Sequence, residues 1–276
     1  MENPADWRKF NPPIDARAIL EQCPRVTVAS SAEQLIALAT GDAAPSERFE
    51  VAYEMPGAGR CVEAEVARVR NGVVANYLEP YMRRRDPDCM LVADDLPTDK
   101  ETFEERYGVP FREVRDEALA WLKTQELLVF ALYAGQADMG METLVLAPAN
   151  AGFFALGLAM LQGIIPYESI GGSFEPRAVI YVAPPLRQTR FGGKQVVVHR
   201  RTADLHEMFS FNLYPGPSAK KGIYGVLIAL GERQGWVAAH CSTVQVVTPY
   251  DNVVTLMHEG ASGSGKSEML EPAHRE

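Results

Sequence analysis

Residues 260–267 of the sequence read Gly-Ala-Ser-Gly-Ser-Gly-Lys-Ser, which fits the pattern G-x-x-x-x-G-K-[ST]. An apolar run at 253–257 comes before this segment, and Glu268-Met269-Leu270 can begin a helix after it. Glycines in such a loop let backbone N–H groups turn inward around phosphate oxygens, and the start of the helix adds its dipole. A strand, loop and helix of this kind must dock against a sheet. The segment therefore predicts a phosphate-binding loop within an α/β fold.

The position of each residue in the loop predicts its chemical role. Lys266 is expected to reach the β- and γ-phosphates of ATP or GTP, and Ser267 to offer its hydroxyl to Mg²⁺. The alternative is a Gly/Ser-rich linker. A triphosphate site normally also needs an acid on another strand to hold Mg²⁺. The residues assigned to binding the nucleotide are Gly260, Ala261, Ser262, Gly263, Ser264, Gly265, Lys266 and Ser267.

Composition narrows the class of protein. Lys and Arg total 27 and Asp and Glu total 36, so the net charge is −9, which disfavours a general nucleic-acid binder. The four cysteines form no CxxC pair, which is typical of free thiols in a reducing compartment. The longest apolar run, 151–165, is too short to span a bilayer and contains Gln162, so it predicts a buried helix. With no signal core at the N-terminus, we expect a cytoplasmic protein that has neither nucleic-acid nor membrane partners.

Hydrophobic patterns predict an α/β or α+β fold with a mixed sheet, because helices and strands alternate along the chain. An acidic, polar segment at 94–106 is expected to be a surface connection. A Ser30-Ser31 pair before an apolar stretch is typical of a helix N-cap. Helices are expected over 112–131, 151–165 and 219–230, the first ending in a possible strand at 127–130. Strands are expected from residue 49, at 62–66, 144–147, 178–183, 195–199, 236–239, 244–247 and 253–257.

Positive charge gathers in residues 186–201, which carry five basic residues and no acid. In an acidic protein this pattern favours an anion site, since the planar guanidinium of arginine binds two oxygens at once. The alternative is that each side chain pairs with an acid of the same chain. A second cluster, Arg83-Arg84-Arg85, precedes Asp86-Pro87. The basic residues of the longer segment are Arg187, Arg190, Lys194, Arg200 and Arg201.

The order of motifs in the second half resembles the phosphoenolpyruvate (PEP) carboxykinases. Lys220-Lys221-Gly222 is followed, nineteen positions after Lys221, by His240 in Ala-His-Cys-Ser, and then by a strand and the glycine loop. Upstream, 111–121 is similar to the family's VRV-x-x-E-x-AW segment, and Arg85-Asp86-Pro87 to its substrate-binding arginine motif. The likeness spans about residues 80–271, is strongest from Tyr214 onward, and points to a branch of this superfamily rather than to a carboxykinase itself.

The resemblance implies roles for matching residues. Lys221 and His240 would be ligands of a catalytic Mn²⁺, and Lys221 and Lys266 would act with Arg85 in catalysis. Ser267 would hold the Mg²⁺ of ATP, while Arg85 and Tyr214 would bind a small carboxylate such as oxaloacetate or PEP. A lysine binds a metal only as the neutral amine, so its pKa must be depressed beside the cation. The alternatives are surface lysines at a helix start and a core histidine.

Two features depart from the carboxykinase pattern. The Gly-Glu pair that precedes the lysines in that family is replaced here by Gly216-Pro217-Ser218. The family's third metal ligand, an aspartate beyond the loop, and its adenine-binding elements would lie past residue 276. We therefore expect a carboxykinase-like N-terminal domain at 1–235 and the first strands, loop and helix start of an incomplete nucleotide-binding domain at 236–276.

The loop also resembles that of HPr kinase/phosphorylase, which has S-G-x-G-K-S-E, matched here by residues 262–268. Three functions follow as expectations. The first is ATP-dependent phosphoryl transfer to or from a small carboxylate by the intact protein. The second is a protein kinase or phosphorylase, which would take a protein substrate. The third is a non-catalytic nucleotide-binding module, which the incomplete metal set favours for this chain alone.

Overall fold

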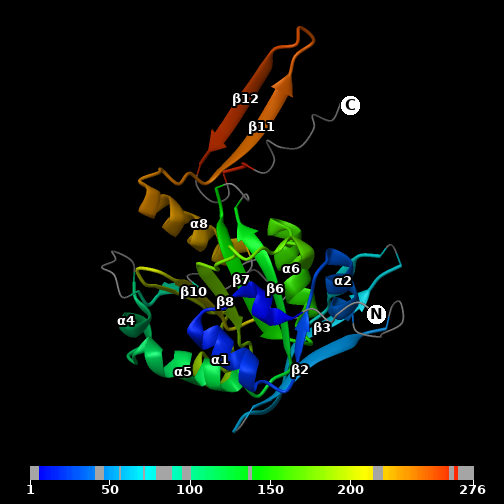
Figure 1. Ribbon diagram of the computed structural model, residues 1–276, viewed down its shortest axis with the longest axis vertical. Coiled ribbons are helices and arrows are strands. Elements are labelled where there is room, and N and C mark those ends of the chain that lie inside the picture. The colour runs from blue at the N-terminus through cyan, green and yellow to red at the C-terminus, as the bar shows by residue number, and fades with distance from the viewer. Residues whose placement is uncertain are drawn as a thin grey trace. The chain divides into compact units, whose positions relative to one another are not determined.

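A computed structural model describes residues 6–40, 47–55, 57–70, 72–78, 89–94, 101–135, 139–213, 220–260 and 264–266 (Figure 1). The chain divides into two compact units, Met1–Leu227 and Ile228–Glu276, and each is described by itself. The division lies within helix α8 (Lys220–Gln234), whereas the sequence analysis placed a boundary just after that helix, at residue 235.

A seven-stranded sheet forms the centre of the first unit. Strands β7, β8 and β10 run parallel to one another, β6 is antiparallel to β7, and β9 is antiparallel to β10. The edge strands β1 and β5 run parallel to β6 and β9. The chain is thus an α/β protein with a mixed sheet, as predicted. In spatial order the strands are β1 (Val26–Val28), β6 (Leu127–Ala134), β7 (Met141–Pro148), β8 (Ala178–Val182), β10 (His206–Ser210), β9 (Val197–Arg201) and β5 (Met90–Val92).

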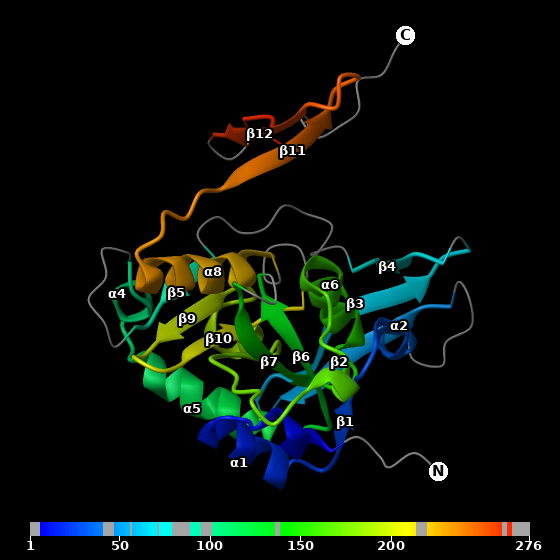
Figure 2. The ribbon, with the colours of Figure 1, turned by 45° about the horizontal axis from the view of Figure 1, so that its top comes forward.

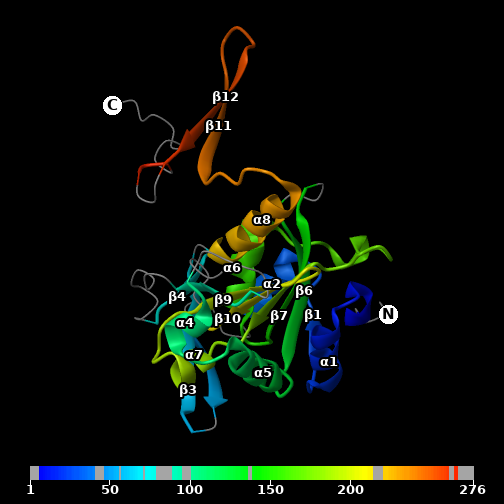
Figure 3. The same cartoon turned by 90° about the vertical axis from the view of Figure 1, so that its left-hand side faces the viewer.

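Helices cover both faces of this sheet (Figure 2). Helices α1 (Ile14–Gln22) and α5 (Phe111–Leu122) share one face, and Figure 3 shows them on the same side of the strands. The other face carries α6 (Gly152–Gln162) and the first half of α8. Gly222 and Gly225 let α8 approach the strands closely, because a Cβ at these positions would lie 2.0 Å from the Met208 sulfur and 2.4 Å from the His199 ring. The remaining helices are η1 (Trp7–Phe10), α2 (Ala32–Thr40), α4 (Phe103–Tyr107), η2 (Tyr167–Ser169) and α7 (Leu186–Arg190).

The sequence patterns explain the core. Strand β8 is buried along its whole length, and β6 and β7 are almost wholly buried, as expected of apolar runs covered on both faces. Helix α6 is apolar on nearly all sides and packs on α2, where Gly152 is required because its Cβ would lie 2.4 Å from the backbone of Leu38. Among the described residues, no helix combines the length and the apolar character needed to cross a bilayer.

A smaller antiparallel sheet also belongs to the first unit. It consists of β2 (Phe49–Met55), β3 (Gly59–Arg68) and β4 (Val74–Asn76), with a register shift between Val51 and Ala52. Strands β2 and β3 confirm the alternation predicted from residue 49 and over 62–66.

The second unit contains the antiparallel hairpin of β11 (Cys241–Val247) and β12 (Val253–Glu259). The strand predicted at residues 236–239 is wrong: this segment is irregular, and Val237 is 95% exposed. Its residues instead follow the end of α8, where Gly235 has a positive φ of 69° and the Trp236 N–H donates to the Gly231 carbonyl at 2.8 Å. Local apolar character suggested a strand, but the turn that closes the helix determines the backbone there.

The described parts of the acidic segment at 94–106 also differ from the expected surface connection, whereas residues 95–100 lie outside the described residues. The Asp94 side chain is fully buried, and the segment leads into α4 through a capping box between Thr102 and Glu105. Its polar residues are therefore used to begin a helix and to pair a buried charge.

Candidate functional site: the glycine loop and an arginine-lined pocket

The glycine loop follows β12 directly. The Lys266 side chain turns back along the loop, and its Nζ donates a hydrogen bond of 2.8 Å to the carbonyl oxygen of Gly260. Gly265, beside the lysine, has a φ of 85°, a conformation that favours glycine. Ala261, Ser262, Gly263 and Ser267 lie outside the described residues.

Gly260 is also needed for close packing inside the loop. A Cβ at this position would lie 2.4 Å from Oγ of Ser264 and 3.1 Å from its Cβ. The Lys266 amine and the Ser264 hydroxyl therefore both lie close to Gly260. A cation and close-lying backbone at the end of a strand form an arrangement that can receive phosphate oxygens.

The structure describes only some of the residues to which the carboxykinase resemblance assigns a role. His240 is exposed and lies in the irregular segment between α8 and β11. Lys221 lies in the first turn of α8, but its side chain is outside the described residues, as are Arg85 and Tyr214 entirely. Within the described part of the chain, no three His, Cys, Asp or Glu side chains come together as a metal site. His240 is thus not joined by such ligands there, and the Mn²⁺ assignment stays a prediction.

The arginines of the basic segment pair with acids of the same chain. Arg187 and Glu63 form an ion pair of 2.6 Å in which both side chains are buried. The guanidinium of Arg201 binds the buried Asp94 through two nitrogens, at 2.5 and 2.8 Å. Arg190 pairs with Glu117 at 2.6 Å. For these three arginines the alternative holds that each side chain pairs with an acid of the same chain. Arg187 and Arg201 are largely buried with their partners, so these two have a structural role and do not face solvent.

A second charge network lies under α5. Glu207, on β10, is fully buried and accepts bonds from Arg115 at 2.6 and 3.0 Å and from Arg200 at 2.8 Å. Arg115 also bonds Asp15 at 2.6 Å. Burial disfavours its charge, but the hydrogen bonds that Arg115 donates to Glu207 and Asp15 outweigh this effect and raise the pKa of Arg115 above its ordinary value. Burial, followed by the charge of Glu207, raises the pKa of the neighbouring Tyr181 phenol.

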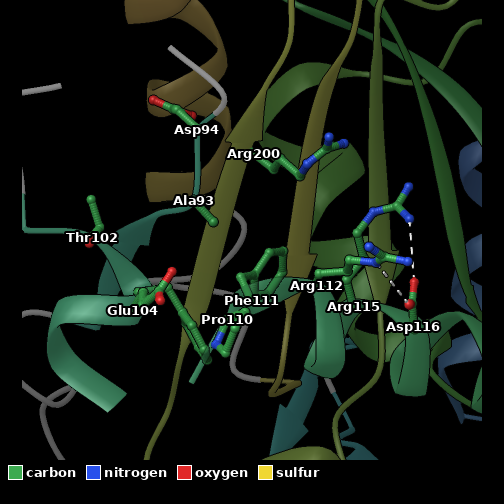
Figure 4. A pocket seen from close by; sticks show the side chains of 11 residues that line it. Ala93, Asp94, Thr102, Glu104, Pro110, Phe111, Arg112, Arg115, Asp116 and Arg200 are labelled. Atoms are coloured by element: carbon green, nitrogen blue, oxygen red, sulfur yellow. Dashed lines mark ion pairs between the residues drawn. The ribbon is translucent and has the colours of Figure 1, made fainter. Parts of the chain in front are cut away.

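These arginines border a pocket of about 500 Å³ (Figure 4). It lies at the carboxyl ends of β5 and β9 and at the beginning of α5, and its lining includes Arg112, Arg115 and Arg200. Arg200 belongs to the basic segment predicted to bind an anion, whereas the pocket itself is not evident from the sequence. Helical spacing puts Arg112 and Arg115 on one face of α5, yet nothing local indicates that β9 lies beside them.

Two histidines are buried on the opposite face of the sheet. Nδ1 of His199 and Nε2 of His206 share a hydrogen bond of 2.8 Å, and the His199 ring packs against Gly225 of α8. His206 is buried, which fits a structural role. The pair supports the first half of α8, which carries Lys221.

Comparison with known proteins places the chain in a family. The profile of the family described as "Domain of unknown function (DUF4914)" matches residues 13–276, so the chain belongs to this family. No curated protein matches the chain.

Proposed function

We propose that this protein binds the phosphates of a nucleoside triphosphate, ATP or GTP, with Mg²⁺ at the glycine loop 260–267. The observation that supports the proposal is the closure of the loop by Lys266, whose amine lies 2.8 Å from the Gly260 carbonyl. An ammonium group has three N–H donors, so this bond is compatible with further bonds to phosphate oxygens. Ser267 would supply a hydroxyl to Mg²⁺, as its place in the motif predicts.

We further propose that the bound nucleotide serves phosphoryl transfer involving a small carboxylate. This rests on the resemblance of Lys221, His240, Tyr214 and Arg85 to the substrate and metal residues of PEP carboxykinases. In such transfer the protein supplies position and electrostatic stabilisation, and the metal supplies charge neutralisation at the phosphates. The direct assay is the manganese-dependent transfer of ³²P from the γ-phosphate of ATP to PEP, with oxaloacetate as the acceptor and ADP and CO₂ as the other products.

Protein phosphorylation is the rival function, favoured by the S-G-S-G-K-S-E sequence of residues 262–268. A kinase of this kind would transfer ³²P from ATP to a serine of a partner protein. Labelled protein with no label in PEP would select the kinase. Labelled PEP without labelled protein would select carboxylate chemistry. Binding of ATP without either reaction would select the non-catalytic module.

Nucleotide binding is tested first by calorimetry. The chain is titrated with ATP and with GTP in the presence of Mg²⁺, and the same titrations are made with Lys266→Ala. We expect Lys266→Ala to weaken binding by about 100-fold or more, because the variant removes a charge-assisted contact to phosphate. Lys9→Ala removes an exposed lysine of the first unit outside the basic segment and is expected to bind as the unchanged protein does. Equal affinity of the Lys266→Ala variant and the unchanged protein would disprove the loop assignment.

A further inference from the structure

We propose that the pocket between α4, α5 and the ends of β5 and β9 binds a small zwitterion, of the size of a free amino acid or a dipeptide. The carboxylate of this ligand would bind at Arg112 and Arg115, and its amine at Glu104. The site belongs wholly to the first unit, so the proposal does not depend on the function of the glycine loop.

Arg115 provides an oriented binding group at the basic side of the pocket. Its Nε and Nη2 are held by Glu207 and Asp15, at 2.6 to 3.0 Å, which fixes the plane of the guanidinium. Its Nη1 lies 3.9 Å from Asp116, within the range of an ion pair but beyond a hydrogen bond. A ligand carboxylate at hydrogen-bond distance would therefore make a stronger contact with Nη1 than Asp116 makes.

Arg112 adds a second guanidinium beside the first. Its Nε lies 3.8 Å from the same Asp116, and its side chain is 88% exposed, so it can turn toward a ligand without breaking a close bond. Figure 4 shows Arg112 and Arg115 together next to Asp116. Both come from the first two turns of α5, whose N-cap, Pro110, makes no side-chain cap hydrogen bond. The helix dipole at this end also favours negative charge.

The charge balance argues for a zwitterion rather than a simple anion. The lining contains three arginines and three acids, and with their partners Arg201, Glu207 and Asp15 the set holds four positive and five negative charges. A lone anion would add an unbalanced charge to this set, whereas a zwitterion adds none. Glu104 is exposed in the first turn of α4 and lies across Phe111 from the arginines (Figure 4), so it can receive the amine.

The size and the remaining surface of the pocket fit such a ligand. A volume of about 500 Å³ lies within the range of small-molecule sites, which is about 300–1,000 Å³. Phe111 and Pro110 lie between the two charged sides and offer apolar contact for a carbon chain. The pocket can therefore hold a chain that separates the two charges.

The test uses calorimetry with a series of linear ω-amino acids, from glycine to 6-aminohexanoate, on the full chain carrying Lys266→Ala. This background removes the loop lysine, so binding at the pocket and at the glycine loop are read separately. We expect at least one member to bind, and Arg112→Gln and Glu104→Gln each to weaken it by about tenfold or more. Two analogues of the best-binding amino acid serve as further ligands: one keeps only the carboxylate and the other keeps only the amine. Both are expected to bind more weakly than the zwitterion.

Matched controls come from an exposed ion pair outside the pocket. Arg177 and Glu175 lie 3.3 Å apart with both side chains about half exposed or more, and Arg177→Gln and Glu175→Gln are expected to leave binding unchanged. The proposal is overturned if no member of the series binds. It is also overturned if Arg112→Gln and Glu104→Gln bind like the controls, or if the simple carboxylate binds as tightly as the zwitterion.

Discussion

Strands β8 and β12 have similar apolar sequences but different surroundings. All five residues of β8 are fully buried, between β7 and β10 and under helices on both faces. In β12, Val253, Leu256 and Met257 are 57%, 44% and 63% exposed, and the strand pairs with β11 in a two-stranded sheet. Apolar residues on both faces of a strand are typical of the centre of a sheet. The comparison shows that the same pattern contributes to a core only where neighbouring elements cover both faces.

The two candidate sites also differ in what holds their residues in place. The arginine-lined pocket is built on charges fixed by a fully buried carboxylate, Glu207, at the centre of the sheet. The glycine loop is fixed by its own sequence, through the Lys266 bond to Gly260 and the close packing of Ser264. Changes in the core should therefore affect the first unit strongly, and the second unit should respond mainly to local changes.

The largest expected loss of stability comes from breaking the buried ion pair of the first unit. Glu63→Ala leaves Arg187 buried without this carboxylate and should lower the free energy of unfolding by about 3–5 kcal/mol. Urea unfolding followed by tryptophan fluorescence measures this, since Trp7 and Trp121 are buried in the first unit. A stability loss below about 1 kcal/mol would show that the pair does not matter.

A control and a rescue accompany this change. Glu175→Ala removes an exposed partner of Arg177 and is expected to cost less than about 1 kcal/mol. The double variant Glu63→Leu with Arg187→Met replaces both charges by apolar groups and should recover most of the stability. If Glu63→Ala does not fold, folding of the double variant still tests the explanation.

The next effect contrasts two leucines. Leu146→Ala, in β7 and fully buried, should reduce the free energy of unfolding by about 2–5 kcal/mol, because it leaves a cavity in the core. Leu256→Ala, in β12 and 44% exposed, should change it by less than about 0.5 kcal/mol. Urea titrations followed by tryptophan fluorescence measure both, since Trp7 and Trp121 lie in the first unit and Trp236 in the second, and equal losses for the two variants would contradict the comparison.

The same contrast between covered and exposed apolar strands explains which parts of the fold could be predicted from the sequence. Strands β7 and β8 are apolar runs and were predicted at 144–147 and 178–183. Strand β6 was predicted only as a possible strand at 127–130, and the helix expected over 112–131 was too long, because α5 ends at Leu122 and β6 follows from Leu127. Strand β10 was missed because His206, Glu207 and Ser210 are polar. His206 and Glu207 are buried with partners from other elements: His199 and Arg200 on the adjacent strand β9, and Arg115 on α5. The strand predicted at 236–239 is wrong because a short apolar run carries no information about whether another strand lies beside it.

The candidate sites were predictable to different degrees. The glycine loop is a contiguous motif, so its residues could be named from the sequence, and the nucleotide itself remains a proposal. The pocket was not predicted, because its lining comes from four separate parts of the chain, at 93–94, 102–104, 110–116 and 200. Only the pairing of β5 with β9 and the packing of α5 bring these parts together.

The smallest expected effect concerns the cap of α4. The backbone N–H and the hydroxyl of Thr102 lower the pKa of Glu105 below its ordinary value of 4.5. The cap therefore stabilises the fold above the unfolded pKa, and this contribution is lost as the pH falls through the lower folded pKa. Glu105→Gln should slightly lower the melting temperature at pH 7 and change it less at pH 3, while Glu168→Gln serves as the control. A difference that grows toward acid pH would contradict this assignment.

The most direct test of the central proposal is the calorimetric titration of the full chain with ATP and Mg²⁺, compared with Lys266→Ala. The account predicts binding by the unchanged protein, a loss of about 100-fold or more in the variant, and unchanged unfolding of the first unit in urea. Absence of ATP and GTP binding by the unchanged protein, or equal affinity in the two proteins, would contradict it.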